Sequence, residues 1–168
     1  MRKLFLLLPL MALLVGCASD KKETACPVLT IEGGQIQGVL AENPGVYVYK
    51  GIPYAEPPIG KLRFKPPVKK LNSDKIYQAY YLGKSCIQIE CETELSSKYE
   101  QGEDCLTLNI WKNEASTLEK KPVMVFIHGG AFGWGGTADP LYEGTNLIKA
   151  QKDVILVTIN YRINILGF

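Results

Sequence analysis

Residues 123–136 read VMVFIHGGAFGWGG, an apolar run that passes directly into a glycine-rich loop. The run itself, Val123–Ile127, is typical of a central strand that is covered on both faces of a sheet. Residues 143–152 then predict a short helix, and residues 154–159 predict a second strand of the same kind. A strand, a loop, a helix and a strand within about 37 residues form the βαβ pattern of a parallel or mixed sheet.

Upstream of this unit, the sequence predicts shorter strands and one irregular segment. Residues 28–40 predict a hairpin that turns at a pair of glycines, and residues 46–49 predict a further strand because they are β-branched and aromatic. Residues 106–111 alternate in the manner of a half-buried strand. Residues 51–67 hold five prolines, so we expect an extended surface loop there, without helix or interior strand.

The glycine-rich loop carries the clearest chemistry of the sequence. His128-Gly129-Gly130-Ala131-Phe132 resembles the HGGG-type loop with which lipases and esterases donate backbone N–H groups to an oxyanion. Such donors stabilise the negative charge that develops on an ester oxygen, and the loss of one typically costs ~2.7–4 kcal/mol. An ordinary strand-to-helix turn accounts for the same residues when they are taken by themselves. Phosphate binding is disfavoured, because neither G-x-G-x-x-G nor G-K-[ST] spacing is present.

Four further blocks of sequence lie around this loop. The first lies within residues 51–67, the second is EDCLTLNIW at residues 103–111, and the others are NYR and LGF within residues 160–168. Together with the loop, they resemble the type-B carboxylesterase (cholinesterase-like) family of α/β-hydrolases in order and spacing. The resemblance covers residues 28–168.

The resemblance implies a fold and a set of site residues. The fold class is α/β, the N-terminal part of an α/β-hydrolase, in which antiparallel N-terminal strands lead into a central mixed sheet that is truncated before the nucleophile elbow. The oxyanion donors are the N–H groups of Gly130 and Ala131, while His128 and Gly129 support the loop. Ala131 stands where the family more often has glycine, but its backbone donor survives that change.

The resemblance also assigns two of the cysteines. Cys86 and Cys105 match the family's first disulfide, and a loop of that size is worth ~3 kcal/mol in the chain-entropy model. Cys91 lies inside that loop and either pairs with Cys26 or remains free. The single histidine and the scattered cysteines do not match zinc spacing, so no metal and no cofactor are expected.

The catalytic triad of the family is missing from the sequence. The nucleophile of an α/β-hydrolase sits in G-x-S-x-G, which does not occur here, and the one histidine belongs to the loop. The acidic pair Glu103 and Asp104 is expected to be structural, and Arg63 and Arg162 are expected to be ion-pair partners. We therefore expect an N-terminal fragment of a serine carboxylesterase that is inactive by itself. The complete enzyme would cleave small-molecule carboxylic esters through an acyl-enzyme.

Two alternatives to this fragment hypothesis stay open. The first is a non-catalytic surface lipoprotein with a hydrolase-derived half-domain. The second is one half of a split esterase, which a separately encoded C-terminal chain would complement. Co-expression and the search for a downstream G-x-S-x-G distinguish them.

Residues 1–16 are typical of an export signal. A basic start precedes an apolar run at residues 4–15, which is too short to span a bilayer. Leu14-Val15-Gly16-Cys17 resembles a bacterial lipobox, which implies cleavage before Cys17, lipidation of this cysteine and attachment to a membrane. An ordinary secretory signal with an incidental cysteine is the alternative.

With this predicted signal, the chain divides into three segments. Residues 1–16 are the lipoprotein signal peptide, residues 17–27 are the lipidated cysteine with a polar tether, and residues 28–168 are a partial carboxylesterase domain. We expect an exported protein that is anchored by lipid in the cell envelope. Ala18 after the cysteine favours the outer membrane if the cell is Gram-negative.

Composition excludes two other classes of protein. Hydrophobic residues at 46% and charged residues at 21% are incompatible with a disordered chain. The 19 basic residues include Arg2 and Lys3, and the other 17 balance the 17 acidic residues. Because the body is neutral, we expect no nucleic-acid partner.

Overall fold

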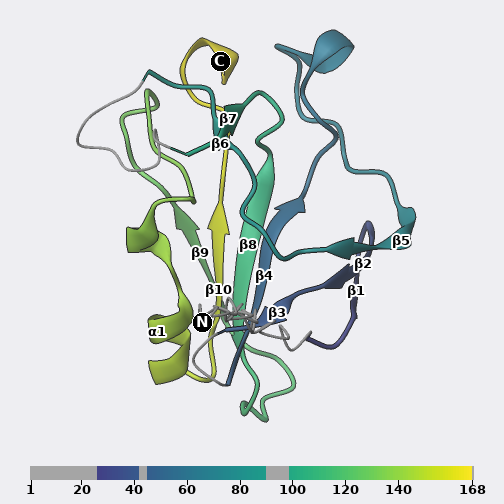
Figure 1. Cartoon of the computed structure of the whole chain (residues 1–168), viewed down its shortest axis with the longest axis vertical. Coiled ribbons are helices and arrows are strands. Elements are labelled where there is room, and N and C mark those ends of the chain that lie inside the picture. Colours follow the sequence, from purple (N-terminus) through teal and green to yellow (C-terminus); the bar gives the residue numbers. More distant parts are fainter. Residues whose placement is uncertain (1–25, 42–44, 90–98, 168) are drawn as a thin grey trace, which may run out of the picture.

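The computed structural model describes residues 26–41, 45–89 and 99–167 (Figure 1). The predicted signal peptide, Cys17 and most of the predicted tether lie outside the described residues. The described residues form three sheets, one short α-helix and short 3-10 turns. Within this part of the chain, no helix has the length and apolar character needed to cross a membrane.

The largest sheet has five strands of mixed orientation. From edge to edge they are β3 (Val39–Leu40), β4 (Val46–Pro53), β8 (Thr107–Asn113), β10 (Ile155–Ile159) and β9 (Val123–Ile127). β8 lies in the middle and runs antiparallel to both β4 and β10. β9 occupies one edge, where it runs parallel to β10.

The predicted βαβ unit is present at this edge of the sheet. Val123 lies opposite Ile155 in the parallel pair, and α1 (Thr145–Ala150) connects the two strands. The mixed sheet and the order strand, loop, helix, strand are therefore confirmed. The helix is shorter than expected because the backbone of Glu143 is extended (φ −69°, ψ 118°) and the backbone leaves the helical region again at Gln151 (φ −112°, ψ 75°).

Two smaller sheets flank the main one. The predicted hairpin is formed by β1 (Leu29–Ile31) and β2 (Gly34–Gln37), and β5 (Ser73–Gln78) adds to β2 in parallel. The third sheet pairs β6 (Ser85–Cys86) with β7 (Gln101–Gly102). Figure 1 places it beyond the upper end of the main sheet, where β8 begins and where β9 and β10 end.

The proline-rich segment differs from its prediction. β4 continues to Pro53 as an interior strand, and Gly60–Leu62 form a 3-10 turn. The sheet tolerates Pro53 because it is the last residue of the strand, beyond a bulge that has already interrupted the ladder. At the bulge, the Gly51 N–H donates to Asn109 Oδ1 at 2.8 Å, so a side chain replaces the missing backbone partner.

Apolar clusters cover both faces of β4 and β8. One cluster combines Val46, Val48, Trp111, Ile148 and Leu156. The opposite face packs against Cys26, Ile36, Tyr49, Ile52 and Ala79. Leu108 and Ile110 belong to this second face, while Trp111 belongs to the first. The alternation predicted at residues 106–111 is therefore present, but its sides are reversed: Thr107, Asn109 and Trp111 are buried, whereas Leu108 and Ile110 are half-buried under the second apolar layer.

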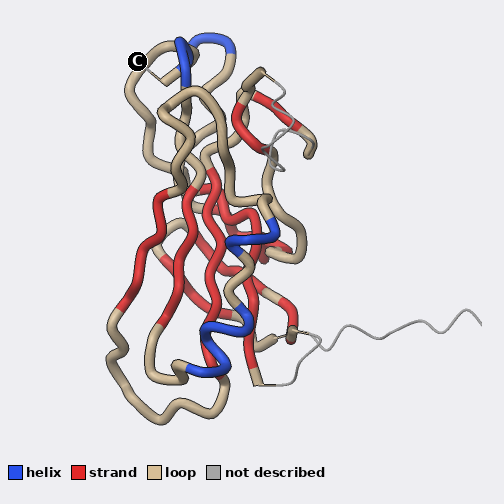
Figure 2. Tube along the Cα trace, turned by 90° about the vertical axis from the view of Figure 1, so that its left-hand side faces the viewer, coloured by secondary structure: helices blue, strands red, loops and turns tan. Residues whose placement is uncertain are grey.

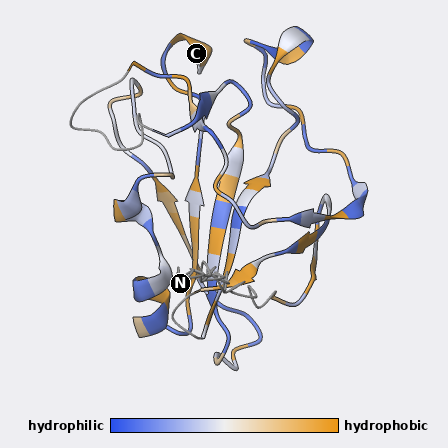
Figure 3. Ribbon diagram, viewed as in Figure 1, coloured by the Kyte–Doolittle hydropathy of each residue, from blue (hydrophilic) through white to orange (hydrophobic). Residues whose placement is uncertain are grey.

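The prediction for Val123–Ile127 is wrong. All five residues of β9 are exposed, from 36% at Phe126 to 66% at Ile127. The reason is its place in the sheet: β10 pairs with one side of β9, and α1 packs on β4 and β8. Figure 2 shows the helix lying to one side of the strands, and Figure 3 shows that β9 is largely apolar, whereas β8 carries polar bands.

Candidate functional site

The loop after β9, residues 128–136, has an unusual backbone. Gly130, Ala131 and Phe132 have φ values of +112°, +51° and +59°. A non-glycine residue in the left-handed region costs roughly 1–2 kcal/mol, so two in succession represent stored strain. Strain of this kind is concentrated at functional sites, where the surrounding structure holds it in place.

Hydrogen bonds within the loop fix this conformation. The Gly130 carbonyl accepts from the N–H groups of Gly133 (2.9 Å) and Trp134 (3.1 Å). A Cβ on Gly130 would lie 1.9 Å from the Trp134 carbonyl oxygen, so only glycine fits there. Among the described residues, the amides of Gly130 and Ala131 have no acceptor. The loop thus turns a carbonyl inward and leaves two successive N–H groups available.

His128 lies beneath the loop. Its side chain is buried, its Nδ1 lies 2.9 Å from the Gly129 carbonyl oxygen, and its ring stacks on that of Tyr161 with 4.4 Å between centroids. The Tyr161 hydroxyl donates to the His128 carbonyl at 2.6 Å. Burial raises the pKa of Tyr161, so this hydroxyl stays a neutral donor. These contacts of His128 are made with the backbone and with a neighbouring ring.

Two buried side-chain amides hold the far end of the loop. Asn160 Oδ1 accepts from the Thr137 N–H at 2.8 Å, and its Nδ2 donates to the Lys84 carbonyl at 3.2 Å. Gln88 forms a comparable pair of contacts with Gly135. Asn160 is visible in the sequence only as part of the NYR block, with no role implied, and Gln88 is not predictable, since a lone glutamine between elements carries no recognisable pattern.

The comparisons with known proteins point to one family. The model of the carboxylesterase family matches residues 25–168. The chain belongs to the carboxylesterase family. It is 41% identical over 143 residues to the para-nitrobenzyl esterase of Bacillus subtilis (strain 168), with 84% of this chain and 28% of the relative covered. It is 36% identical over 155 residues to the acetylcholinesterase of Electrophorus electricus, with coverages of 84% and 24%.

Solved carboxylesterase structures show the same arrangement of strands. A thermophilic para-nitrobenzyl esterase superposes with a TM-score of 0.76 at 42% identity, covering 84% of this chain and 29% of that one. The Geobacillus stearothermophilus carboxylesterase superposes with a TM-score of 0.72 at 41% identity, with coverages of 84% and 27%. The fold class, the N-terminal part of an α/β-hydrolase, is confirmed. The chain spans less than a third of the length of these relatives.

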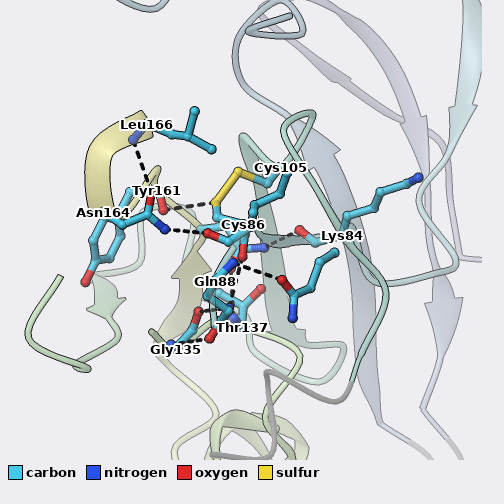
Figure 4. The surroundings of a disulfide bond; sticks show 12 residues. Lys84, Cys86, Gln88, Cys105, Gly135, Thr137, Tyr161, Asn164 and Leu166 are labelled. Atoms are coloured by element: carbon cyan, nitrogen blue, oxygen red, sulfur yellow. Dashed lines mark hydrogen bonds between the residues drawn. A yellow bond between two sulfur atoms is a disulfide. The ribbon is translucent and has the colours of Figure 1, made fainter. Parts of the chain in front are cut away.

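The disulfide lies beside the loop at residues 128–136. Cys86 and Cys105, the pair that the family resemblance implies, are joined, and their Cα atoms are 5.1 Å apart (Figure 4). Cys91 lies outside the described residues, and Cys26 is a buried free thiol within them. Burial raises the pKa of Cys26 to about 11, so this thiol is protonated at neutral pH.

The two arginines that were expected to form ion pairs differ in their partners. Arg63 Nε lies 2.7 Å from Glu103 Oε2, an ion pair of the expected kind. Arg162 has no ion pair within the described residues, and its NH2 group donates to the Lys65 carbonyl at 2.9 Å. The expectation for Arg162 is therefore not met in this part of the chain, because the carbonyl takes the place of a carboxylate.

An open hollow of about 360 Å³ lies at the same end of the sheet. Phe132 is the loop residue in its wall, and Gly130 and Ala131 are not part of the lining. Most of the lining side chains are apolar or aromatic: Tyr54, Pro67, Leu106, Phe132, Tyr161, Arg162, Ile163 and Gly167. No group of three potential metal ligands occurs among the described residues.

Proposed function

We propose that this chain supplies the oxyanion loop of a serine carboxylesterase that hydrolyses small carboxylic esters. The observation that carries the proposal is the pair of successive N–H groups at Gly130 and Ala131, which a strained and internally bonded loop holds in place. The match to the carboxylesterase family over residues 25–168 supports the same reaction class. Names of relatives, such as para-nitrobenzyl esterase, point to carboxylic esters as the substrate class.

In the proposed reaction, a serine hydroxyl oxygen attacks the ester carbonyl carbon while a histidine base takes the hydroxyl proton. The carbonyl π electrons move to the oxygen, where the N–H groups of Gly130 and Ala131 stabilise the charge. Collapse of this intermediate expels the alcohol, which takes the proton from the base, and leaves the acyl-enzyme. Water repeats the sequence and releases the acid. Each donor contributes ~2.7–4 kcal/mol to the transition state.

Within this proposal, the serine, acid and base belong to the C-terminal part of the esterase, whether this part continues the same chain or is a separate polypeptide. The 168-residue sequence contains no G-x-S-x-G, and its one histidine packs under the loop. β9 supports this part of the proposal, because among the described residues its outer edge is unpaired and its exposed apolar side chains lie directly before the proposed oxyanion loop. We expect the chain to be inactive by itself.

Co-expression tests this function. The full chain is produced with the C-terminal remainder of the Bacillus subtilis para-nitrobenzyl esterase, either as a separate chain or fused after Phe168. We expect hydrolysis of p-nitrophenyl acetate in the combination and in neither part separately. Failure of both the separate and the fused form to hydrolyse the ester would count against the function. Turnover by the chain by itself, abolished by a serine-directed organophosphate, would refute its inactivity.

The lipid anchor is a separate part of the proposal. Residues 1–16 with Cys17 carry the features of a lipoprotein signal, and two or more acyl chains are needed for stable anchoring. Growth with radiolabelled palmitate should label the wild-type chain and leave Cys17→Ser unlabelled. Label in both proteins would exclude Cys17 as the attachment site. In a Gram-negative host, the labelled protein should fractionate with the outer membrane.

A further inference from the structure

Gln88 is a buried side chain from another segment that contacts the loop at residues 128–136. It follows β6 and is 8% exposed. Its Oε1 accepts from the Gly135 N–H at 2.9 Å, and its Nε2 donates to the Gly135 carbonyl at 3.0 Å. Figure 4 shows both contacts beside the disulfide. One amide group thus satisfies both backbone groups of a single residue.

Gly135 connects Gln88 to the start of the loop. Its φ is +105°, and a Cβ at this position would lie 2.5 Å from the Gly129 carbonyl oxygen and 2.6 Å from His128 Nδ1. The two ends of the loop are therefore in direct contact, with no space between them for a side chain. A displacement of Gly135 would move the residues that immediately precede the two free N–H groups.

Gln88 also forms hydrogen bonds with two residues outside the loop. Its Nε2 also donates to the Cys86 carbonyl at 3.0 Å, and its backbone N–H donates to Gln101 Oε1 at 2.9 Å. Cys86 is tied to Cys105 by the disulfide, and Gln101 belongs to β7. The side chain therefore bridges a cross-linked segment and the loop, and only a primary amide of this length offers both an acceptor and two donors.

We propose that Gln88 is a positioning residue for the oxyanion loop, which holds Gly135 and through it the N–H groups of Gly130 and Ala131. The catalytic meaning of this role rests on the proposed esterase function, whereas the ordering of the loop does not. A leucine at this position would leave three backbone groups without their partner.

Amide hydrogen exchange of the full chain tests the ordering. In Gln88→Leu, we expect the amides of Gly133, Trp134 and Gly135 to exchange about tenfold faster, the factor that one ordinary hydrogen bond represents. Amides within β8 should keep their wild-type rates. Unchanged rates in the loop would overturn the proposal.

Asn113→Leu is the matched control. Asn113 is also a buried amide, with contacts to the Ile148 carbonyl (3.2 Å) and the Ala115 N–H (2.9 Å), but it lies at the opposite end of β8 from the loop. This variant should leave the exchange of the loop unchanged. An equal acceleration of the loop amides in both variants would mean general destabilisation and would also overturn the proposal.

The complemented esterase provides the catalytic readout. With active sites counted by organophosphate titration, Gln88→Leu should lower kcat per site by about 10–100-fold with KM within about threefold, since oxyanion donors act in the transition state. An unchanged kcat per titrated site would reduce Gln88 to a purely structural residue. If complementation yields no hydrolysis at all, the esterase proposal fails, and the exchange experiment still decides whether Gln88 orders the loop.

Discussion

β8 and β9 lie in the same sheet with one strand between them, yet their surroundings are opposite. β8 pairs on both sides, and every residue in it is buried or half-buried. Among the described residues, β9 pairs only with β10 and is exposed along its whole length, although its residues are the more continuously apolar. The difference teaches that neighbours, and not the apolar character of a strand, decide how far it is buried.

The same contrast extends to what each strand supports. β8 holds the two apolar clusters together, and Asn109 within it bonds the Gly51 N–H and Thr158 Oγ1. β9 leads into the strained loop that carries the two free N–H groups. The well-packed part of the carboxylesterase domain is therefore adjacent to, and distinct from, the loop for which we propose a catalytic role.

The largest expected effect is the loss of Trp111. Its side chain is 1% exposed in β8, and its Nε1 donates to Glu143 Oε1 at 3.0 Å. Trp111→Ala should lower the free energy of unfolding by about 3–5 kcal/mol, or abolish cooperative unfolding, when followed by circular dichroism in urea. Phe126→Ala in β9 is the control and should cost about 1 kcal/mol or less. Equal losses would erase the contrast between the strands.

Glycine substitutions in the loop after β9 come next. Gly130→Ala places a Cβ against the Trp134 carbonyl oxygen at a φ of +112°, and should cost about 1–3 kcal/mol in urea unfolding. Gly129→Ala has no atom within 4 Å of the new Cβ, so we expect a change below about 0.5 kcal/mol. A larger loss at Gly129 than at Gly130 would contradict the described loop conformation.

A pH series probes the buried side of the sheet. Burial raises the pKa of Cys26 to about 11 in the folded protein, so the folded state retains a proton that the unfolded thiol loses earlier. This contribution to stability is complete below about pH 9 and falls as the pH rises toward 11. Urea midpoints should show that Cys26→Ala flattens this decline. This variant is needed as a comparison because burial also raises the pKa of tyrosines, that of Tyr54 to about 12, and these residues contribute to the same decline. An identical slope in the variant would exclude Cys26 as its source.

The smallest expected effect lies in β9 itself. Val125→Thr changes a residue that is 54% exposed and should alter the free energy of unfolding by less than about 0.5 kcal/mol. Val48→Thr in β4, where the side chain is 2% exposed, buries a hydroxyl and should cost about 1–3 kcal/mol. The comparison is measured by chemical unfolding of the full chain. A large loss at Val125 would show that β9 is covered.

Much of the fold could be predicted from local patterns. The hairpin at β1 and β2 follows from its glycine turn, and the βαβ unit follows from two apolar runs on either side of a short helix. Pro53 misled the prediction, because a proline at the end of a strand beyond a bulge has a role that composition does not reveal. Burial was the weakest point, since the pattern of β8 and β9 is local whereas their coverage depends on distant segments.

The candidate site divides in the same way. The residues of the loop were identifiable because HGGAF is a contiguous motif, and Cys86 with Cys105 followed from the family resemblance. Gln88 was not identifiable, because it is 47 residues from Gly135 and its contacts exist only after β6 and the loop pack together. Asn160 was visible as part of a motif, but its bonds to Thr137 and Lys84 were not.

By itself, the sequence determined the family, the order of the strands in the βαβ unit and the residues of the glycine-rich loop, because each depends on neighbours in the chain. Tertiary structure alone decided that β9 is an edge and β8 the middle, and that one glutamine holds the loop. The physical reason is that burial and hydrogen bonding are satisfied between segments far apart in sequence. A local pattern predicts which side chains of a segment are apolar, whereas the tertiary packing decides which of them are covered.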